Sequence, residues 1–131
     1  MQRFPAYSVL ISVYAKESAT WLKESLDSVL AQTVPPEQIV LVEDGPLTPE
    51  LNSVIGSFCE HNKNLFDLVT LPKNEGLGNA LAHGVPVCRN EIIARMDSDD
   101  YAFPTRMEKE LAKMSTYNLD MVGSQIVEFI S

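Results

Sequence analysis

The stretch "YSVLISVYAKESATWLKESLDSVL", residues 7–30, holds the two patterns on which the fold depends. Residues 7–14 form a short apolar run rich in β-branched and aromatic types, which is typical of a buried strand. Ser18 can cap a helix after this strand, because its hydroxyl can accept from a free N–H of the first turn. The apolar residues of that helix share one face, and they are Leu22, Leu26, Val29 and Leu30. The stretch therefore predicts a strand followed by an amphipathic helix.

The same alternation of strand and helix continues along the chain. Further strands are predicted at residues 38–42, 66–71, 91–96 and 121–130. Further helices are predicted after the cap Thr48, within "NEGLGNALAHGV" (residues 74–85), and from Pro104 to about residue 117. Pro86 should kink or shorten the second of these, because proline lacks the N–H that a helix interior needs. The pattern predicts one α/β domain over residues 1–131, with a mostly parallel sheet and helices on both faces.

Composition narrows the class of protein. The chain has 131 residues, 45% of them apolar, and a net charge of −8. No stretch approaches the roughly 18 apolar residues of a membrane span, and residues 7–14 are not followed by a small-residue cleavage site. We therefore expect a cytoplasmic protein. Lys and Arg do not cluster, which argues against a nucleic-acid partner. Cys59 and Cys88 lie far apart, which favours buried free thiols over a disulfide.

Three polar segments follow strands of the predicted sheet: "VYAKE" (residues 13–17), "EDGP" (residues 43–46) and "DSDD" (residues 97–100). In parallel α/β sheets, ligands bind at the carboxyl ends of the strands. Alternate residues of extended chain point the same way, so Asp97 and Asp99 can share one face. Such oxygen ligands suit Mg²⁺ or Mn²⁺, which would join the carboxylates to a diphosphate. The alternative is a solvated turn that leads into the next helix.

The segment "EDGP" can likewise be interpreted either as a turn or as part of a ligand site. Glu43 and Asp44 end the second strand, and Gly45-Pro46 turns the chain. Asp before Gly is common at the start of a turn, so turn chemistry alone can explain it. The functional alternative is a carboxylate that accepts a hydrogen bond from a nucleobase N–H or a ribose hydroxyl.

Taken together, the ordered segments "VLISVYAKE", "WLKESLDSVLAQT", "IVLVEDGP", "PKNEGLGNALAHGV" and "IIARMDSDDYAFPTRM" resemble the family 2 glycosyltransferases. The resemblance runs over residues 8–127 and is greatest to bacterial enzymes of exopolysaccharide, capsule or O-antigen synthesis. It implies the GT-A fold, with a Rossmann-like nucleotide-binding half. It also implies inverting transfer of a sugar from a nucleoside-diphosphate sugar, most often UDP-linked, to a glycan or lipid-linked acceptor.

The resemblance also implies roles for individual residues. Asp97 and Asp99 match the family's metal motif for Mn²⁺ or Mg²⁺, and Arg106 fits the "P-x-R" pattern that follows it. The residues implied at the substrate are Tyr14, Glu43, Asp44, Lys73, Asn74, Gly76, Asp97 and Asp100. Two departures are that His83 stands where the family commonly has Asn and that Pro46 replaces its usual Ser. We assign His83 no role.

No catalytic base is assigned, because in the family that carboxylate lies well after the metal motif. We expect it beyond Ser131, so residues 1–131 would be an N-terminal fragment without the acceptor-binding half. A lipid-linked acceptor would bring the enzyme to the cytoplasmic face of the inner membrane. A homodimer is a further possibility, because the absence of the acceptor-binding half would leave apolar surface exposed through which two copies could associate.

Two other functions remain as alternatives. A non-catalytic module that binds nucleotide or a partner protein would need no base. A sugar-nucleotide pyrophosphorylase would favour a Gly-rich, basic loop after the first strand, and "VYAKESATW" has no glycine. A response-regulator receiver is excluded by the position of the acids, which follow the second and fourth strands.

Overall fold

The computed structural model describes residues 4–116 and 125–128. The described strands are β1 (Tyr7–Val13), β2 (Gln38–Glu43), β3 (Phe66–Thr70), β4 (Ile92–Asp97) and β5 (Gln125–Glu128). The described helices are α1 (Ala19–Leu30), α2 (Pro49–His61), α3 (Leu77–Gly84), the 3₁₀ turn η1 (Val85–Val87) and α4 (Arg106–Thr116). The five strands form one sheet in the order β3-β2-β1-β4-β5, and every pair is parallel. The predicted α/β class is confirmed.

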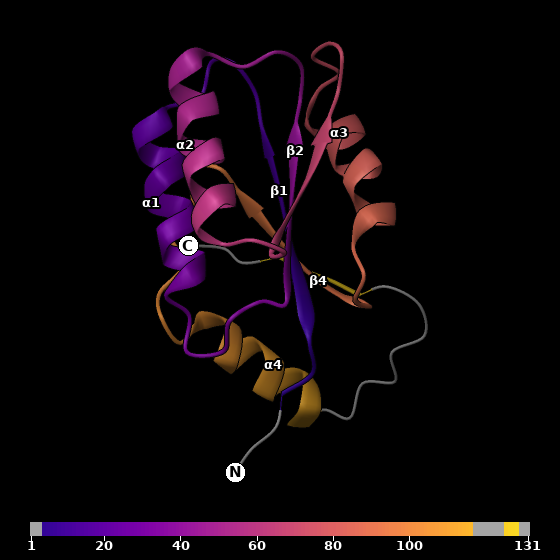
Figure 1. Ribbon diagram of the computed structural model, residues 1–131. Coiled ribbons are helices and arrows are strands. Elements are labelled where there is room, and N and C mark those ends of the chain that lie inside the picture. Colours follow the sequence, from indigo (N-terminus) through magenta and orange to yellow (C-terminus); the bar gives the residue numbers. More distant parts are fainter. Residues whose placement is uncertain (1–3, 117–124, 129–131) are drawn as a thin grey trace.

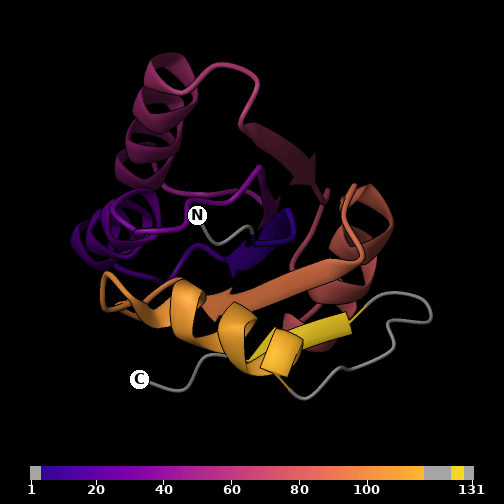
Figure 2. The same ribbon diagram turned by 90° about the horizontal axis from the view of Figure 1, so that it is seen from below.

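The sheet lies between two layers of helices, with α1 and α2 on one face and α3 on the other (Figures 1 and 2). Met107 and Leu111 of α4 belong to the same core cluster as α1 and α2, so α4 packs on that face as well. β1 is the central strand, and all seven of its residues are buried. Because every strand runs the same way, the carboxyl ends of β1, β2 and β4 meet at one edge of the sheet.

The helix boundaries follow from local chemistry. Ser18 Oγ accepts from Trp21 N at 3.3 Å, and Thr48 Oγ1 accepts from Leu51 N at 3.2 Å, as predicted for caps of α1 and α2. α3 ends at Gly84, and Pro86 lies in the 3₁₀ turn that follows, so the predicted shortening is confirmed. Gly84 also allows close packing on the sheet, because a Cβ there would lie 2.4 Å from Leu10 Cδ1.

The structure corrects two details. α4 begins at Arg106 and not at Pro104, because residues 104–105 form a turn in which the Pro104 carbonyl accepts from Thr33 N at 2.8 Å. Cys59 and Cys88 are free thiols, as predicted, but they are half-buried and not buried. Burial raises the pKa of Cys88 to about 11, so its thiol stays protonated at neutral pH.

The predicted strand at residues 121–130 is confirmed at residues 125–128, and its remaining residues lie outside the described range. Residue 117, at the end of the predicted fourth helix, also lies outside that range.

Within the described residues, no helix is long and apolar enough to cross a membrane.

Candidate functional site

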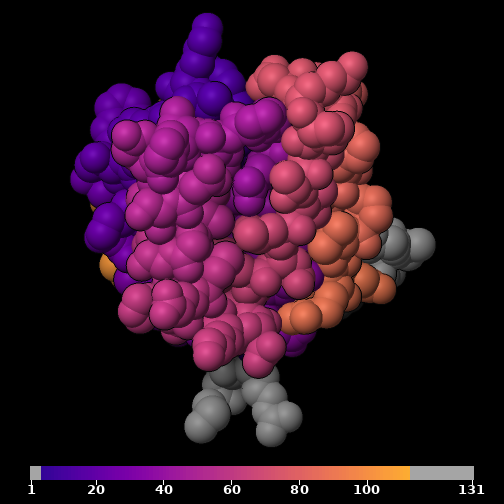
Figure 3. All heavy atoms as spheres, turned by 45° about the horizontal axis from the view of Figure 1, so that its top comes forward, coloured from indigo at the N-terminus to yellow at the C-terminus, as the bar shows by residue number. Residues whose placement is uncertain are grey.

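A cavity of about 370 Å³ opens at the carboxyl ends of the strands. Its walls come from the segments after β1, β2, β3 and β4. The lining residues are Ser12, Tyr14, Glu17, Asp44, Asn74, Gly76, Leu77, Asp97, Ser98 and Asp99. Figure 3 turns this edge toward the viewer, with the indigo segment after β1 at the upper left and the pink segment after β3 at the upper right. Of the three segments singled out in the sequence, each contributes at least one residue to the cavity.

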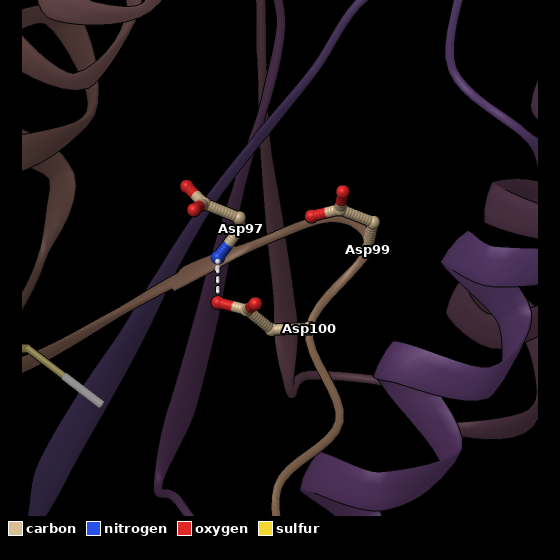
Figure 4. A group of neighbouring side chains, drawn as sticks. All are labelled: Asp97, Asp99 and Asp100. Carbon is tan, nitrogen blue, oxygen red and sulfur yellow. Dashed lines mark hydrogen bonds between the residues drawn. The ribbon is translucent and has the colours of Figure 1, made fainter. Parts of the chain in front are cut away.

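The acidic turn after β4 brings three carboxylates together. Each of Asp97, Asp99 and Asp100 offers one oxygen, and these oxygens lie within 4.8 Å of one another. Figure 4 shows the carboxylates of Asp97 and Asp99 on the same side of the turn. The Asp100 carboxylate folds back, and its Oδ2 accepts from Asp97 N at 3.2 Å. Asp100 N in turn donates to Asp97 O at 3.1 Å. The segment is therefore a hydrogen-bonded turn that also places two carboxylates side by side.

This donor set fits a hard divalent cation. Carboxylates this close repel one another in the ionised state, and none of the residues that line the cavity in the described structure is Lys or Arg. Mg²⁺ and Mn²⁺ prefer oxygen ligands, and Mg²⁺ commonly takes only one or two protein carboxylates. Asp97 and Asp99 are both exposed, so water or a substrate oxygen can complete a coordination shell.

Asp44 holds the loop on the opposite wall. It is only 3% exposed, and its carboxylate accepts from Glu75 N at 2.7 Å, Gly76 N at 3.1 Å and Asn74 Nδ2 at 3.2 Å. Gly45, at φ +91°, allows the two segments to approach, because a Cβ there would lie 2.7 Å from Asn74 N. Asp44 thus lines the cavity and also anchors residues 74–76, a structural role that the sequence interpretation missed. The sequence contains the Asp-Gly turn at residues 44–45 and the "N-x-G" segment at residues 74–76, but nothing in it indicates that the two are in contact.

Glu17 and Ser98 are two further residues that sequence reasoning missed. Ser98 Oγ donates to Glu17 Oε2, and Ser98 is only 3% exposed, so it faces inward between Asp97 and Asp99. Burial, followed by the charges of Asp99 and Asp97, raises the pKa of Glu17 to about 7. The sequence signal was a lone acid in "VYAKE", with nothing to connect it to residue 98.

Three of the predicted substrate residues do not line this cavity: Glu43, Lys73 and Asp100. Glu43 lies on the α1 and α2 face of its strand, since Ile39 and Leu41 of the same parity belong to that core. Burial, and then the charge of Glu43, raises the pKa of the nearby Cys59 thiol. The Lys73 side chain is exposed.

Arg106 and His83 also lie outside the cavity wall. Arg106 starts α4, and its N–H donates to Phe103 O at 2.9 Å. His83 Nε2 lies 3.3 Å from Glu75 Oε1 on the exposed side of α3.

The fold and the site together define a class of protein: a parallel α/β domain with an acidic cavity at the carboxyl ends of its strands. The family model for glycosyl transferase family 2 matches residues 8–131, so the chain belongs to that family. An uncharacterized glycosyltransferase of Haemophilus influenzae is 42% identical over 94% of this chain and 46% of that protein. The amylovoran biosynthesis glycosyltransferase AmsE of Erwinia amylovora is 40% identical over 94% of this chain and 46% of AmsE.

A third relative carries a substrate in its name. The UDP-Gal:alpha-D-GlcNAc-diphosphoundecaprenol beta-1,3-galactosyltransferase of Escherichia coli is 39% identical over 95% of this chain and 45% of that enzyme. This chain thus spans less than half the length of these three relatives.

Solved structures confirm the predicted GT-A fold. TarS of S. aureus in complex with UDP superimposes with a TM-score of 0.74 at 22% identity, over 86% of this chain and 33% of that one. The mannosyltransferase PcManGT of Pyrobaculum calidifontis, in complex with GDP-Man and Mn²⁺, gives a TM-score of 0.70 at 24% identity, over 85% of this chain and 32% of that one.

Proposed function

We propose that this chain is the donor-binding half of a metal-dependent, inverting glycosyltransferase that transfers a sugar from a nucleoside-diphosphate sugar during polysaccharide biosynthesis. The observation that carries the proposal is the convergence of Asp97 and Asp99 in the same cavity as Tyr14 and Asp44. Family membership and the names of the relatives support the reaction class. They also weigh against the pyrophosphorylase alternative.

The cavity suggests how a donor is held. In the proposed arrangement the nucleoside contacts Tyr14 and Asp44, and the exposed ring of Tyr14 offers a stacking surface. Asp44 accepts from the loop, and its oxygens have further lone pairs for a base N–H or a ribose hydroxyl. Asn74 and Gly76 close this wall, while Asp97 and Asp99 face the diphosphate end. TarS of S. aureus, which has a similar fold, has been solved with UDP, so uracil is the first base to test.

Asp97 and Asp99 are proposed to hold Mn²⁺ or Mg²⁺, with Asp100 fixing the backbone N–H of Asp97. The bound cation would supply positive charge against the leaving nucleoside diphosphate. Asp100 supports the turn, and its carboxylate, which has an oxygen within 4.8 Å of those of Asp97 and Asp99, can also support the metal shell or contact the donor. Glu43 and Lys73 do not line the cavity, so we propose no direct contact between these residues and the donor.

Transfer with inversion needs a base that deprotonates the acceptor hydroxyl on the opposite face of the sugar from the leaving group. We assign no residue of 1–131 to this role and place the base in a portion of the protein outside this chain. The proposed acceptor is a glycan or a lipid-linked saccharide, which would bring the enzyme to the cytoplasmic face of the inner membrane.

A fluorescence titration tests the donor class. Trp21 is the single tryptophan, and it lines a second cavity that shares Tyr14, Glu17, Ser98 and Asp99 with the first. UDP, GDP and ADP, each with and without Mg²⁺, should give a saturable change with at least one nucleotide, and only with the metal. No change with any of them, in protein shown by circular dichroism to be folded, would contradict the proposal.

A further inference from the structure

A row of buried polar side chains on one face of α1 points toward the segment that follows β4. Ser25, Ser28 and Gln32 are 0%, 4% and 5% exposed. Their spacing places them on one side of the helix, with Gln32 just beyond its end. Residues 98–105, which include the acidic turn, contain no helix or strand, and the chain from there to α4 passes beside α1 (Figures 1 and 2).

Gln32 makes the densest set of contacts with this segment. Its Nε2 donates to Phe103 O at 2.8 Å and to Ala102 O at 3.3 Å. Its Oε1 accepts from Met107 N, in the first turn of α4, at 3.0 Å. A third contact of Nε2, to Ser28 O at 3.1 Å, ties the amide to its own helix. One side chain therefore holds both the irregular segment and the start of the next helix.

The two serines continue the row toward the acidic turn. Ser28 Oγ accepts from Ala102 N at 3.0 Å and donates to Ser25 O at 2.6 Å. Ser25 Oγ donates to Asp97 O at 3.4 Å. The row thus contacts the chain at Asp97, two residues before Asp99, and again at Ala102, two residues after Asp100.

These contacts cannot be replaced by apolar packing. Buried backbone N–H and C=O groups need partners, and an irregular segment has no ladder to provide them. Two backbone bonds close turns within the segment itself, Asp100 N to Asp97 O and Arg106 N to Phe103 O. The amide of Gln32 and the hydroxyl of Ser28 therefore help to hold the segment against α1, together with Thr33 N, which donates to Pro104 O, and Glu17, which accepts from Ser98. The position of the segment in turn affects the direction in which the acidic turn is presented.

We infer that Gln32, assisted by Ser28, is a positioning residue for the acidic turn, and that it sets the affinity for a metal–nucleotide complex without touching it. The inference rests on the proposed donor site. Groups that hydrogen-bond a metal ligand directly commonly change metal affinity by about 10- to 100-fold when they are mutated. Gln32 acts one step further away, through residues 102–103, so we expect an effect near the lower end of this range.

Gln38 offers a matched control within the same chain. Gln38 is 1% exposed, and its amide also makes several bonds: to Ser8 Oγ at 2.7 Å, Asp67 Oδ2 at 2.7 Å, Val87 O at 3.0 Å and Arg89 N at 2.8 Å. It lies at the start of β2, and none of these partners belongs to residues 97–107. Gln32→Leu and Gln38→Leu remove equivalent buried amides, so a general loss of stability affects both variants.

The experiment measures two quantities in each variant, at a temperature where circular dichroism shows the protein folded. The first is hydrogen exchange, and Gln32→Leu should accelerate exchange at residues 97–107 selectively, including the amides of Ala102 and Met107. The second is the affinity for UDP in the presence of Mn²⁺, which should fall about 10-fold or more in Gln32→Leu and stay unchanged in Gln38→Leu. Ser28→Ala, a smaller change, should show the same direction in both measurements if Gln32→Leu does not fold.

The outcomes separate this inference from the proposed function. Failure of the unaltered protein to bind UDP or any other nucleoside diphosphate contradicts the proposed function, and the exchange pattern still decides whether Gln32 orders the turn. Equal losses of UDP affinity in Gln32→Leu and Gln38→Leu, or unchanged exchange at residues 97–107, would overturn the positioning role.

Discussion

Ser98 donates a hydrogen bond to the carboxylate of Glu17, although 81 positions separate them in the chain. The contact joins the loop after β1 to the acidic turn after β4, at the edge of the sheet where the cavity opens. Glu17 is thereby held close to Asp97 and Asp99, and this proximity raises its pKa in addition to the effect of burial. Together with Asp44, these residues make the cavity acidic on three segments, which follow β1, β2 and β4.

The stability of the metal-free protein should depend on the protonation of Glu17. Its pKa rises from an ordinary value of 4.5 to about 7 on folding, so the folded state binds the proton more tightly than the unfolded state. The stabilisation is complete below the ordinary value and is lost as the pH rises through about 7. Urea unfolding over this pH range should show a decline that Glu17→Gln reduces. Glu24→Gln, an exposed change on α1, serves as the control, and an equal reduction there would contradict the assignment.

Asp44→Asn should loosen the wall formed by residues 74–76. The carboxylate accepts from two backbone N–H groups and from the Asn74 amide, and the variant must turn an NH₂ group toward at least one donor. An unsatisfied buried donor costs about 1–3 kcal/mol, so the free energy of unfolding should fall by that amount. Denaturant titration measures it, with the exposed change Asp27→Asn as control. A variant as stable as the unaltered protein would show that this hydrogen-bond set is not what holds the loop.

Gly45→Ala should be strongly destabilising, and Gly56→Ala should not. Gly45 has a φ of +91°, and an added Cβ would lie 2.7 Å from Asn74 N, whereas a Cβ at Gly56 meets nothing within 4 Å. We expect a loss of about 1–3 kcal/mol at Gly45 from backbone strain alone. In α2, Gly56→Ala should gain about 0.5–1 kcal/mol, because alanine favours the helix. Thermal unfolding of the two variants compares them directly, and similar changes in both would contradict this account of Gly45.

Much of the fold could be predicted from the sequence because its signals are local. The apolar runs of β1, β2 and β4 are short and bounded by turn residues, and the caps Ser18 and Thr48 bond as their residue types predict. Parallel strands then place the segments after β1, β2 and β4 at one edge without further information.

The contacts between these segments could not be predicted in the same way. Glu43 and Asp44 are adjacent acids of similar chemistry, and only the parity of β2 turns Glu43 toward Cys59. The bond between Ser98 and Glu17 depends on how two loops pack, and nothing in the residues near either one indicates the other. Gln32 lies two residues beyond the end of α1, and nothing near it in the sequence indicates that it binds the segment before α4.

The central claim is that Asp97 and Asp99 bind a divalent cation that holds the donor's diphosphate. Calorimetric titration with UDP, with and without Mn²⁺, on the unaltered chain, Asp99→Ala and the exposed control Asp27→Ala tests it most directly. We predict that the unaltered chain and Asp27→Ala bind UDP only when Mn²⁺ is present, and that Asp99→Ala does not bind. Equal Mn²⁺-dependent binding by folded Asp99→Ala, or UDP binding that does not need the metal, would contradict the claim.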